Sequence, residues 1–264
     1  MARLDSELVA RGIARSRQLA KEMIKNGSVT VGGITIYKPS AEVLPEAEIK
    51  SAETEFYVGR GAYKLEKAAE VFSLDFSDKV CLDIGASTGG FTEFMLLGGA
   101  KRVIAVDVGH GQLAQSLRDD ERVVDAEGTD IRNVTLEMTG GEVDFICGDV
   151  SFISLKKILP KAYELLQNEA CAVMLIKPQF EAGRKAVGKR GIVRDKKEHI
   201  KVLTDIDEFA ASLGFFSEAY TYSPIRGGSG NIEYLVKLVK ARRTPVIHNF
   251  QELVGEAFGK LKGA

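Results

Sequence analysis

The stretch that decides the fold class of this 264-residue chain is Leu82-Asp83-Ile84-Gly85-Ala86-Ser87-Thr88-Gly89-Gly90-Phe91. The stretch begins in the second half of an apolar, strand-like segment (79–84) and ends in the first turn of a helical segment (90–97). In open α/β sheets a ligand binds at such a strand-to-helix turn, on the carboxyl edge of the sheet. Glycines there allow close approach of a ligand and backbone torsions that other residues resist.

Strand-like and helical segments alternate from about Gly59 onward, which predicts an α/β fold with a doubly wound, mostly parallel sheet. The expected strands are 79–84, 102–108, 122–126, 144–149, 170–176, 215–222 and 234–239, and the expected helices are 90–97, 112–117, 155–167 and 196–213. The last two strands are joined by Arg226-Gly-Gly-Ser-Gly-Asn without a helix. This seven-stranded pattern with a terminal antiparallel hairpin resembles the Rossmann-like sheet of class I methyltransferases.

The glycine spacing points to the kind of cofactor. The glycines follow G-x-x-x-G-G, whereas a dinucleotide fingerprint reads G-x-G-x-x-G, so we favour S-adenosylmethionine and keep a dehydrogenase as the weaker alternative. Asp107 ends the second strand, where a carboxylate could bind ribose hydroxyls, and Asp130 follows the third, where it could bind an adenine amino group. The predicted cofactor-binding residues are Asp83, Gly85, Ala86, Ser87, Thr88, Gly89, Gly90, Phe91, Asp107, Asp130 and Asp149.

The first fifty residues predict a separate small α+β domain. Helices are expected near 5–11 and over 17–26, the second capped by Ser16, followed by a hairpin with its turn at Gly32-Gly33. On the second helix Leu19, Met23 and Ile24 should face inward. Arg17, Lys21 and Lys25 recur every four residues and should share an exposed face. The polar stretch 45–55 is expected to lead into a linker.

This segment resembles the S4-type RNA-binding domain in four places: Arg3-Leu-Asp, Arg15-Ser-Arg17, the hairpin from Asn26 to Gly33, and Lys38-Pro-Ser. The resemblance implies contact with structured RNA. We therefore expect an RNA-binding domain over 1–52, a linker over 53–58 and a methyltransferase domain over 59–264.

Charge is distributed unevenly along a chain whose net charge is only −1. Residues 1–38 hold seven basic and three acidic side chains, and residues 184–201 hold eight basic and two acidic ones. Such local patches suit phosphate contacts, although one patch alone would be ordinary solvated charge. The predicted RNA-binding residues are Arg3, Arg15, Arg17, Lys21, Lys25, Lys38, Arg60, Arg184, Lys189 and Arg190.

Four polar residues fall where strand ends should meet the cofactor crevice: Lys64, Asp149, Lys177 and Glu233. A lysine at the end of an apolar strand is costly unless it has partners or a function. In this order the four resemble the catalytic tetrad of FtsJ-like ribose 2'-O-methyltransferases. The words around them resemble the TlyA (haemolysin A) family: Gly59-Arg-Gly-Ala-Tyr-Lys, Asp107-Val-Gly-His-Gly-Gln-Leu, Val150-Ser-Phe-Ile-Ser-Leu and Ile176-Lys-Pro-Gln-Phe-Glu.

The resemblance implies methyl transfer from S-adenosylmethionine to a cytidine ribose of ribosomal RNA, in 23S rRNA and, for some members of the family, also in 16S rRNA. It assigns the general base to Lys177, its orientation to Asp149, and the holding of the ribose to Lys64 and Glu233. A buried lysine amine that is partly neutral could accept the proton of a ribose hydroxyl.

Other features narrow the class of protein. Apolar runs are too short to cross a bilayer, no signal peptide is expected at Met1-Ala-Arg-Leu-Asp, and the scattered histidines predict no metal site. Cys81, Cys147 and Cys171 should be buried thiols, and residues 247–262 an amphipathic helix. We expect a cytoplasmic monomer. A pore-forming haemolysin and a catalytically inactive RNA-binding protein stay open as alternatives.

Overall fold

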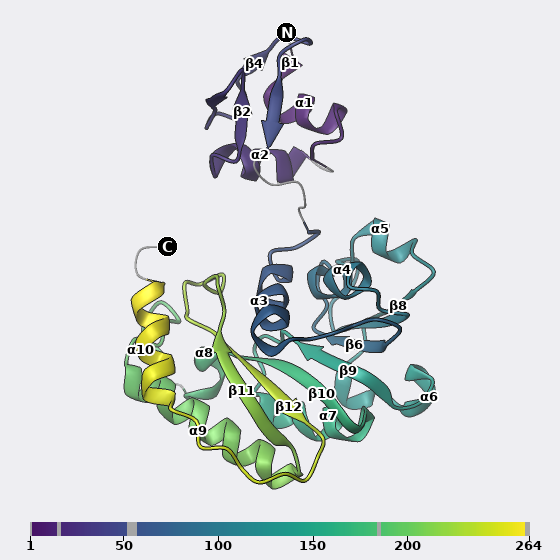
Figure 1. Cartoon of the computed structure of the whole chain (residues 1–264), viewed down its shortest axis with the longest axis vertical. Coiled ribbons are helices and arrows are strands. Elements are labelled where there is room, and N and C mark those ends of the chain that lie inside the picture. The colour runs from purple at the N-terminus through teal and green to yellow at the C-terminus, as the bar shows by residue number, and fades with distance from the viewer. Residues whose placement is uncertain (1, 15–16, 52–56, 184–185, 262–264) are drawn as a thin grey trace. The chain divides into compact units, whose positions relative to one another are not determined.

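A seven-stranded sheet forms the centre of the larger of two compact units, Val58–Ala264 (Figure 1). The structure is a computed structural model that describes residues 2–14, 17–51, 57–183 and 186–261. The strand order is β11-β12-β10-β9-β6-β7-β8. The strands are β6 (Val80–Ile84), β7 (Arg102–Asp107), β8 (Val123–Glu127), β9 (Val143–Gly148), β10 (Leu166–Ile176), β11 (Phe216–Tyr222) and β12 (Tyr234–Val239).

The pairing confirms the expected Rossmann-like sheet. β6 runs parallel to β7 and β9, and the outer pairs β7–β8 and β9–β10 are also parallel. β12 lies antiparallel between β10 and β11, as the loop without a helix predicts. Because the parallel strands share one direction, the ends of β6, β7, β9 and β10 meet at one edge. That edge carries the site described below.

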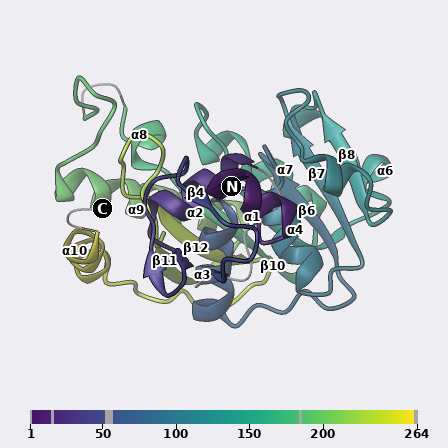
Figure 2. The same cartoon turned by 90° about the horizontal axis from the view of Figure 1, so that it is seen from above.

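Helices cover both faces of the sheet, each above its own apolar core. On one face lie α7 (Leu159–Leu165), α9 (Lys196–Leu213) and α10 (Phe250–Lys260). On the other lie α3 (Ala62–Phe72), α4 (Gly90–Leu97) and the short α5 (Gln115–Arg118). Figures 1 and 2 both show α9 and α10 together at the β11 end of the sheet. Short segments complete the unit: η1 (Ile131–Asn133), α6 (Leu136–Thr139), η2 (Leu155–Lys157) and α8 (Pro178–Glu181).

Several expected boundaries need correction. Helix α3 was not predicted, although Lys64 lies in its first turn. The helix expected over 155–167 is two pieces, η2 and α7, with Pro160 in the first turn of the second. The helix expected over 112–117 begins only at Gln115, and the one expected over 247–262 is α10, Phe250–Lys260.

The smaller unit, Met1–Tyr57, packs two helices against short strands. These are β1 (Ala2–Arg3), α1 (Leu4–Ala10), α2 (Arg17–Lys25), β2 (Val29–Val31), β3 (Ile34–Thr35), β4 (Glu42–Val43) and β5 (Ile49–Ser51). The predicted hairpin is present as β2 and β3. Strand β5 corrects the prediction for 45–55, because it pairs with β2 as a third strand. The expected linker, 53–58, lies mostly outside the described residues.

On α2 the predicted faces are confirmed where side chains are described. Met23 and Ile24 are fully buried, while Arg17, Lys21 and Lys25 are exposed. The predicted cap Ser16 lies outside the described residues, and so does the side chain of Leu19. In the described part of the chain, no helix is both long and apolar enough to span a membrane.

Candidate active site

The glycine-rich turn between β6 and α4 brings three parts of the chain together. Gly85 has a φ of +82°, and a side chain there would come within 2.7 Å of the backbone oxygen of Asp149. A side chain at Gly90 would come within 2.9 Å of the Ala62 nitrogen and the Gly59 oxygen. Glycine is therefore required where the turn packs on the end of β9 and the start of α3.

Two adjoining cavities of about 430 and 560 Å3 lie at this edge of the sheet. The first reaches from the glycine-rich turn to Lys177 and Glu233, and the second extends along the ends of β7 and β8 to Asp107 and Asp130. They form one groove, because five residues line both: Gly85, Ser87, Asp149, Ser151 and Phe152.

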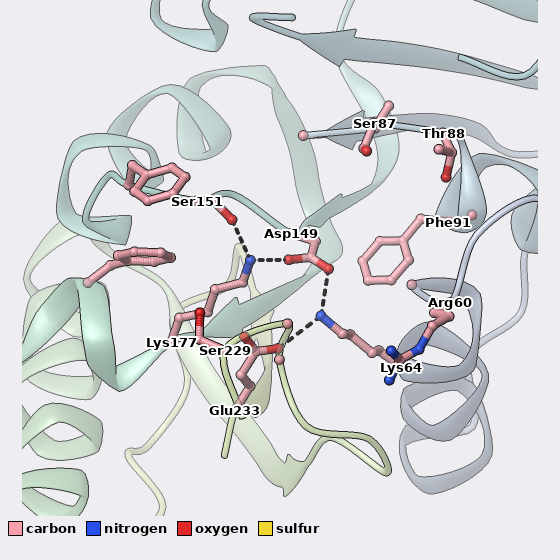
Figure 3. Close-up of a pocket in the computed structure, with 18 of the residues that line it drawn as sticks. Arg60, Lys64, Ser87, Thr88, Phe91, Asp149, Ser151, Lys177, Ser229 and Glu233 are labelled. Atoms are coloured by element: carbon pink, nitrogen blue, oxygen red, sulfur yellow. Dashed lines mark hydrogen bonds and ion pairs between the residues drawn. The ribbon is translucent and has the colours of Figure 1, made fainter. Parts of the chain in front are cut away.

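The four predicted catalytic side chains meet in the first cavity and form one chain of contacts (Figure 3). Lys64 Nζ donates to Asp149 Oδ2 and to Glu233 Oε2, both at 2.9 Å. Lys177 Nζ lies 2.5 Å from Asp149 Oδ1. Each comes from a different element: α3, the end of β9, the end of β10 and the residue before β12.

Ion pairing outweighs burial for the two central members of this network. Burial alone would lower the pKa of Lys64, but the charges of Asp149 and Glu233 together raise it above its ordinary value. Burial likewise works to raise the pKa of Asp149, and the charges of Lys64 and Lys177 hold it below its ordinary value. Both groups are therefore charged at neutral pH, although their side chains are almost buried.

Several residues of the site were not predicted individually. Ser151 Oγ accepts a hydrogen bond from Lys177 Nζ at 2.9 Å, and Gln179 Nε2 donates to Glu233 Oε1 at 3.3 Å. Glu181 accepts from Ser154 Oγ and Leu155 N, which ties α8 to the loop after β9. The residues that were not predicted lie in two of the motifs quoted for the family, 150–155 and 176–181. The motifs therefore marked this part of the site but did not assign a role to each side chain.

Two aromatic rings stand at the edge of the cavity beside Lys177. Phe152 is 91% exposed and has a φ of +63°, a conformation that costs a phenylalanine energy. Its ring lies 5.1 Å from the ring of Phe180, measured between centroids. An apolar surface held in solvent next to the charged network is available to a planar ligand.

The predicted cofactor acids line the second cavity in fixed orientations. Asp107 accepts the backbone N–H groups of Ser87 at 2.8 Å and Gly109 at 2.7 Å, one on each carboxylate oxygen. Asp130 is held by Arg132, whose hydrogen bonds lower the pKa of that carboxyl to about 2. A groove with fixed carboxylates and a close-packed glycine turn fits a nucleoside that carries positive charge, as S-adenosylmethionine does.

The remaining predicted cofactor residues lie in the first cavity with one exception. Asp83, Ala86, Ser87, Thr88, Gly90 and Phe91 all line it, but Gly89 lines neither cavity. Instead, a side chain at Gly89 would clash with Leu113 and Leu117, and the φ of +94° at this position also favours glycine. Gly89 therefore allows the turn to pack against α5 and the preceding loop. Asp83 is fully buried, and burial raises its pKa to about 7.

The predicted RNA contacts fall into groups. Arg60 is exposed and lines the first cavity, and Lys189 and Arg190 are exposed on the loop before α9. In the smaller unit Lys21, Lys25 and Lys38 are exposed, whereas Arg3 and Arg17 share the buried carboxylate of Asp5 at 2.9 and 3.3 Å. Arg15 and Arg184 lie outside the described residues.

The cysteines are free thiols, with Cys81 and Cys147 buried and Cys171 partly so. Burial raises the pKa of all three, to about 12 for Cys81. Among the described residues, no three histidine, cysteine or acidic side chains are grouped so that they could hold a metal ion.

Comparison with known proteins adds the family. A profile for the FtsJ-like methyltransferase matches residues 57–240, and one for the S4 domain matches residues 2–49. The 16S/23S rRNA (cytidine-2'-O)-methyltransferase TlyA of Mycobacterium tuberculosis is 44% identical over 90% of this chain and 89% of that protein. Hemolysin A of Brachyspira hyodysenteriae is 42% identical over 90% of this chain and 99% of that protein.

The solved structure of one relative has the same fold over nearly the full length of this chain. A candidate hemolysin from Streptococcus thermophilus is 41% identical, with a TM-score of 0.78 over 98% of this chain and 96% of that chain. The 23S rRNA (cytidine-2'-O)-methyltransferase TlyA of Campylobacter jejuni is more distant, 34% identical over 88% of this chain and 97% of that protein. The chain belongs to the TlyA family of FtsJ-like methyltransferases.

Proposed function

We propose that this protein transfers a methyl group from S-adenosylmethionine to the 2'-hydroxyl of a cytidine ribose in ribosomal RNA. The observation that carries the proposal is the network of Lys64, Asp149, Lys177 and Glu233 beside the glycine-rich turn. It supplies two lysine amino groups and two carboxyl groups at the point where the two cavities join. Relatives named as rRNA (cytidine-2'-O)-methyltransferases support the substrate.

The second cavity and the glycine-rich turn are the proposed site of the methyl donor. S-adenosylmethionine supplies a methyl group bound to a positively charged sulfur. Asp107 would bind the ribose hydroxyls of the donor, and Asp130 its adenine amino group. Asp149 lines both cavities, so its carboxylate would lie between the donor and the RNA ribose. There its negative charge would stabilise the positively charged sulfur of the donor.

The surroundings of the two lysines support Lys177 as the general base. Lys64 lies between two carboxylates and its pKa is raised, so it keeps its proton and is better suited to hold the ribose. Lys177 faces one carboxylate and the neutral hydroxyl of Ser151. As the 2'-hydroxyl accepts the methyl group, its proton would pass to Nζ of Lys177, which acts in this step as the neutral amine, since an ammonium group cannot accept a proton.

The exposed ring of Phe152, with the half-buried ring of Phe180 beside it, is suited to contact the base of the target nucleotide. Aromatic rings stack on unpaired bases, and sequence-specific RNA recognition mostly uses bases taken out of the helix. Arg60 at the same cavity could bind a neighbouring phosphate. The proposal includes a cytoplasmic monomer that acts on 23S rRNA, with 16S rRNA as a second target to be tested.

The test is transfer of labelled methyl from S-adenosylmethionine to purified ribosomal subunits and assembled ribosomes. We expect label in RNA that resists alkaline hydrolysis, because a 2'-O-methyl group blocks cleavage of the adjacent phosphodiester. Lys177→Ala should lower kcat by roughly 10²- to 10⁴-fold, the usual contribution of a positioned base. Its Kd for S-adenosylmethionine should change little, which serves as the folding control.

Other results would decide against the proposal. Wild-type turnover by Lys177→Ala would refute the assignment of the base. Donor binding without label in any RNA would favour an inactive RNA-binding protein. The name Hemolysin A of one relative makes membrane lysis a further alternative; release of haemoglobin from erythrocytes by purified, detergent-free protein would support it, and we expect none.

A further inference from the structure

Asn231 connects the loop before Glu233 to a distant basic segment. Its side chain is fully buried two residues before Glu233. Nδ2 donates to the carbonyl oxygen of Gly191 at 2.8 Å, and Oδ1 accepts the N–H of Val193 at 3.0 Å. Gly191 and Val193 belong to the segment 188–194, which we call the basic turn. Both hydrogen-bonding ends of the amide are thus used to hold this segment.

A second buried side chain makes a similar connection on the other side of Glu233. His199, near the start of α9, contacts the carbonyl oxygen of Val193 through Nε2 at 3.0 Å. Its Nδ1 contacts the hydroxyl of Tyr234 at 2.9 Å. Tyr234 directly follows Glu233, so the chain is tied to the basic turn on both sides of the carboxylate. Neither His199 nor Tyr234 is accessible to water.

The basic turn is closed internally and presents its cations to solvent. The N–H of Gly188 donates to Ile192 O at 3.1 Å, and the N–H of Gly191 donates to Gly188 O at 2.8 Å. The side chains of Lys189, Arg190 and Arg194 are exposed. Within the described part of the chain, none of these three cations forms an ion pair with an acidic side chain. They are free to bind an anion.

A buried amide and a buried imidazole are costly unless all their polar atoms are paired. Here the polar atoms of both side chains hold the basic turn in a fixed position relative to the carboxylate of Glu233. Phosphate contacts are what set the register of a nucleic acid on a protein. A misplacement of the reacting group by about 1 Å can lower the rate roughly 10²-fold. A fixed distance between the bound phosphate and the target ribose would therefore protect the rate of methyl transfer.

We propose that Asn231 and His199 are positioning residues for RNA, which hold the basic turn so that Lys189 and Arg190 bind phosphates next to the target ribose. This inference rests on the proposed function, because the ribose must be the group held at Glu233. It assigns the ligand of the turn as the phosphodiester backbone flanking the modified nucleotide.

A double-mutant cycle tests the inference in the full-length protein. Its members are Asn231→Ala, the tip variant Lys189→Ala/Arg190→Ala, and the combination of the two. For each we would measure kcat, KM for the ribosomal substrate at several salt concentrations, and Kd for S-adenosylmethionine. The tip variant should reduce the slope of log KM against log salt by about 1.4 to 1.8, the loss of two phosphate contacts.

We expect Asn231→Ala to raise KM for RNA and to reduce the same slope, with Kd for the donor within about twofold of wild type. The combined variant should be no more than about twofold worse than the tip variant, because residues that act through each other are not additive. Multiplied effects, or an Asn231→Ala variant with an unchanged salt slope, would overturn the inference.

Two further variants keep the result unambiguous. Lys101→Ala removes an exposed cation just before β7, at the opposite edge of the sheet, and should leave the slope unchanged. If Asn231→Ala does not fold, Asn231→Asp replaces it in the cycle, since it keeps the acceptor for Val193 but loses the donor to Gly191. A wild-type enzyme that modifies no ribosomal RNA overturns the proposed function as well, whereas an active enzyme with additive variants overturns this inference alone.

Discussion

The buried carboxyl group of Asp83 links the stability of the protein to pH. Its side chain is fully buried at the wall of the first cavity and accepts a hydrogen bond from Thr92 Oγ1 at 2.7 Å. Burial raises its pKa from an ordinary 3.8 to about 7. The folded state therefore favours the neutral acid. This contribution to stability is complete below pH 3.8 and is lost as the pH rises through about 7.

The variant Asp83→Asn should remove this pH dependence. Between pH 5 and pH 8 we expect the wild type to lose on the order of 3 kcal/mol of unfolding free energy relative to the variant. Denaturant unfolding of both proteins across that range measures the difference, and other titrating groups cancel in the comparison. Parallel curves for the two proteins would show that Asp83 ionises normally.

Single residues of the site differ in how far the sequence predicts them. Asp149 and Lys177 follow from their places at strand ends, because parallel strands bring those ends to one edge. Ser151 could not be inferred in the same way, since its position depends on the loop at Phe152, whose φ is +63°. A positive φ at a phenylalanine is set by tertiary contacts and leaves no pattern in the sequence.

Helix α3 places Lys64 over the sheet, and its contact with α4 determines that position. The first turn of α3 packs on Gly90, where a side chain would come within 2.9 Å of the Ala62 nitrogen. The neighbours are backbone atoms, which cannot move aside as a side chain can. The depth at which α3 lies on α4 therefore depends on the glycine.

Gly90→Ala should displace α3 and with it Lys64. We expect a loss of about 1 to 3 kcal/mol of stability, as for other overpacked sites, and a fall in kcat for methyl transfer. Gly255→Ala in α10 is the matched control, since nothing lies within 4 Å of the added methyl group. It should leave kcat unchanged and raise stability by up to about 1 kcal/mol. Equal thermal shifts in the two variants would contradict the packing argument.

Elements with local patterns were predicted, and those fixed by distant partners were not. Helix α9 and strand β12 have the predicted bounds, because α9 has a long helical period of buried residues and β12 is a short run that is apolar except for Lys237. Strand β5 has only three residues and exists because β2 pairs with it from twenty residues away. Helix α3 is a different case: Ala62, Leu65, Ala68 and Phe72 form a buried face with helical spacing that could have been recognised.

At the scale of the whole molecule, RNA binding must depend on a few local cations. The net charge is −1, and residues 1–57 contain eight basic and eight acidic side chains. Neither the chain nor its smaller unit attracts RNA through bulk charge. In that unit the acidic side chains fall mainly after residue 41, whereas Lys21, Lys25 and Lys38 are exposed.

Replacing these three lysines by alanine should weaken RNA binding without affecting the methyl donor. The slope of log Kd for ribosomal RNA against log salt should fall by about 2 to 3, since each lost phosphate contact contributes about 0.7 to 0.9. Kd for S-adenosylmethionine should stay constant, because every described residue that lines the two cavities belongs to the larger unit. Lys50→Ala is the control: it removes an exposed lysine that already pairs with Glu48 at 2.8 Å. A triple variant with the salt slope of the wild type would show that the smaller unit binds RNA through other groups, and a changed donor affinity would show that the two units are coupled.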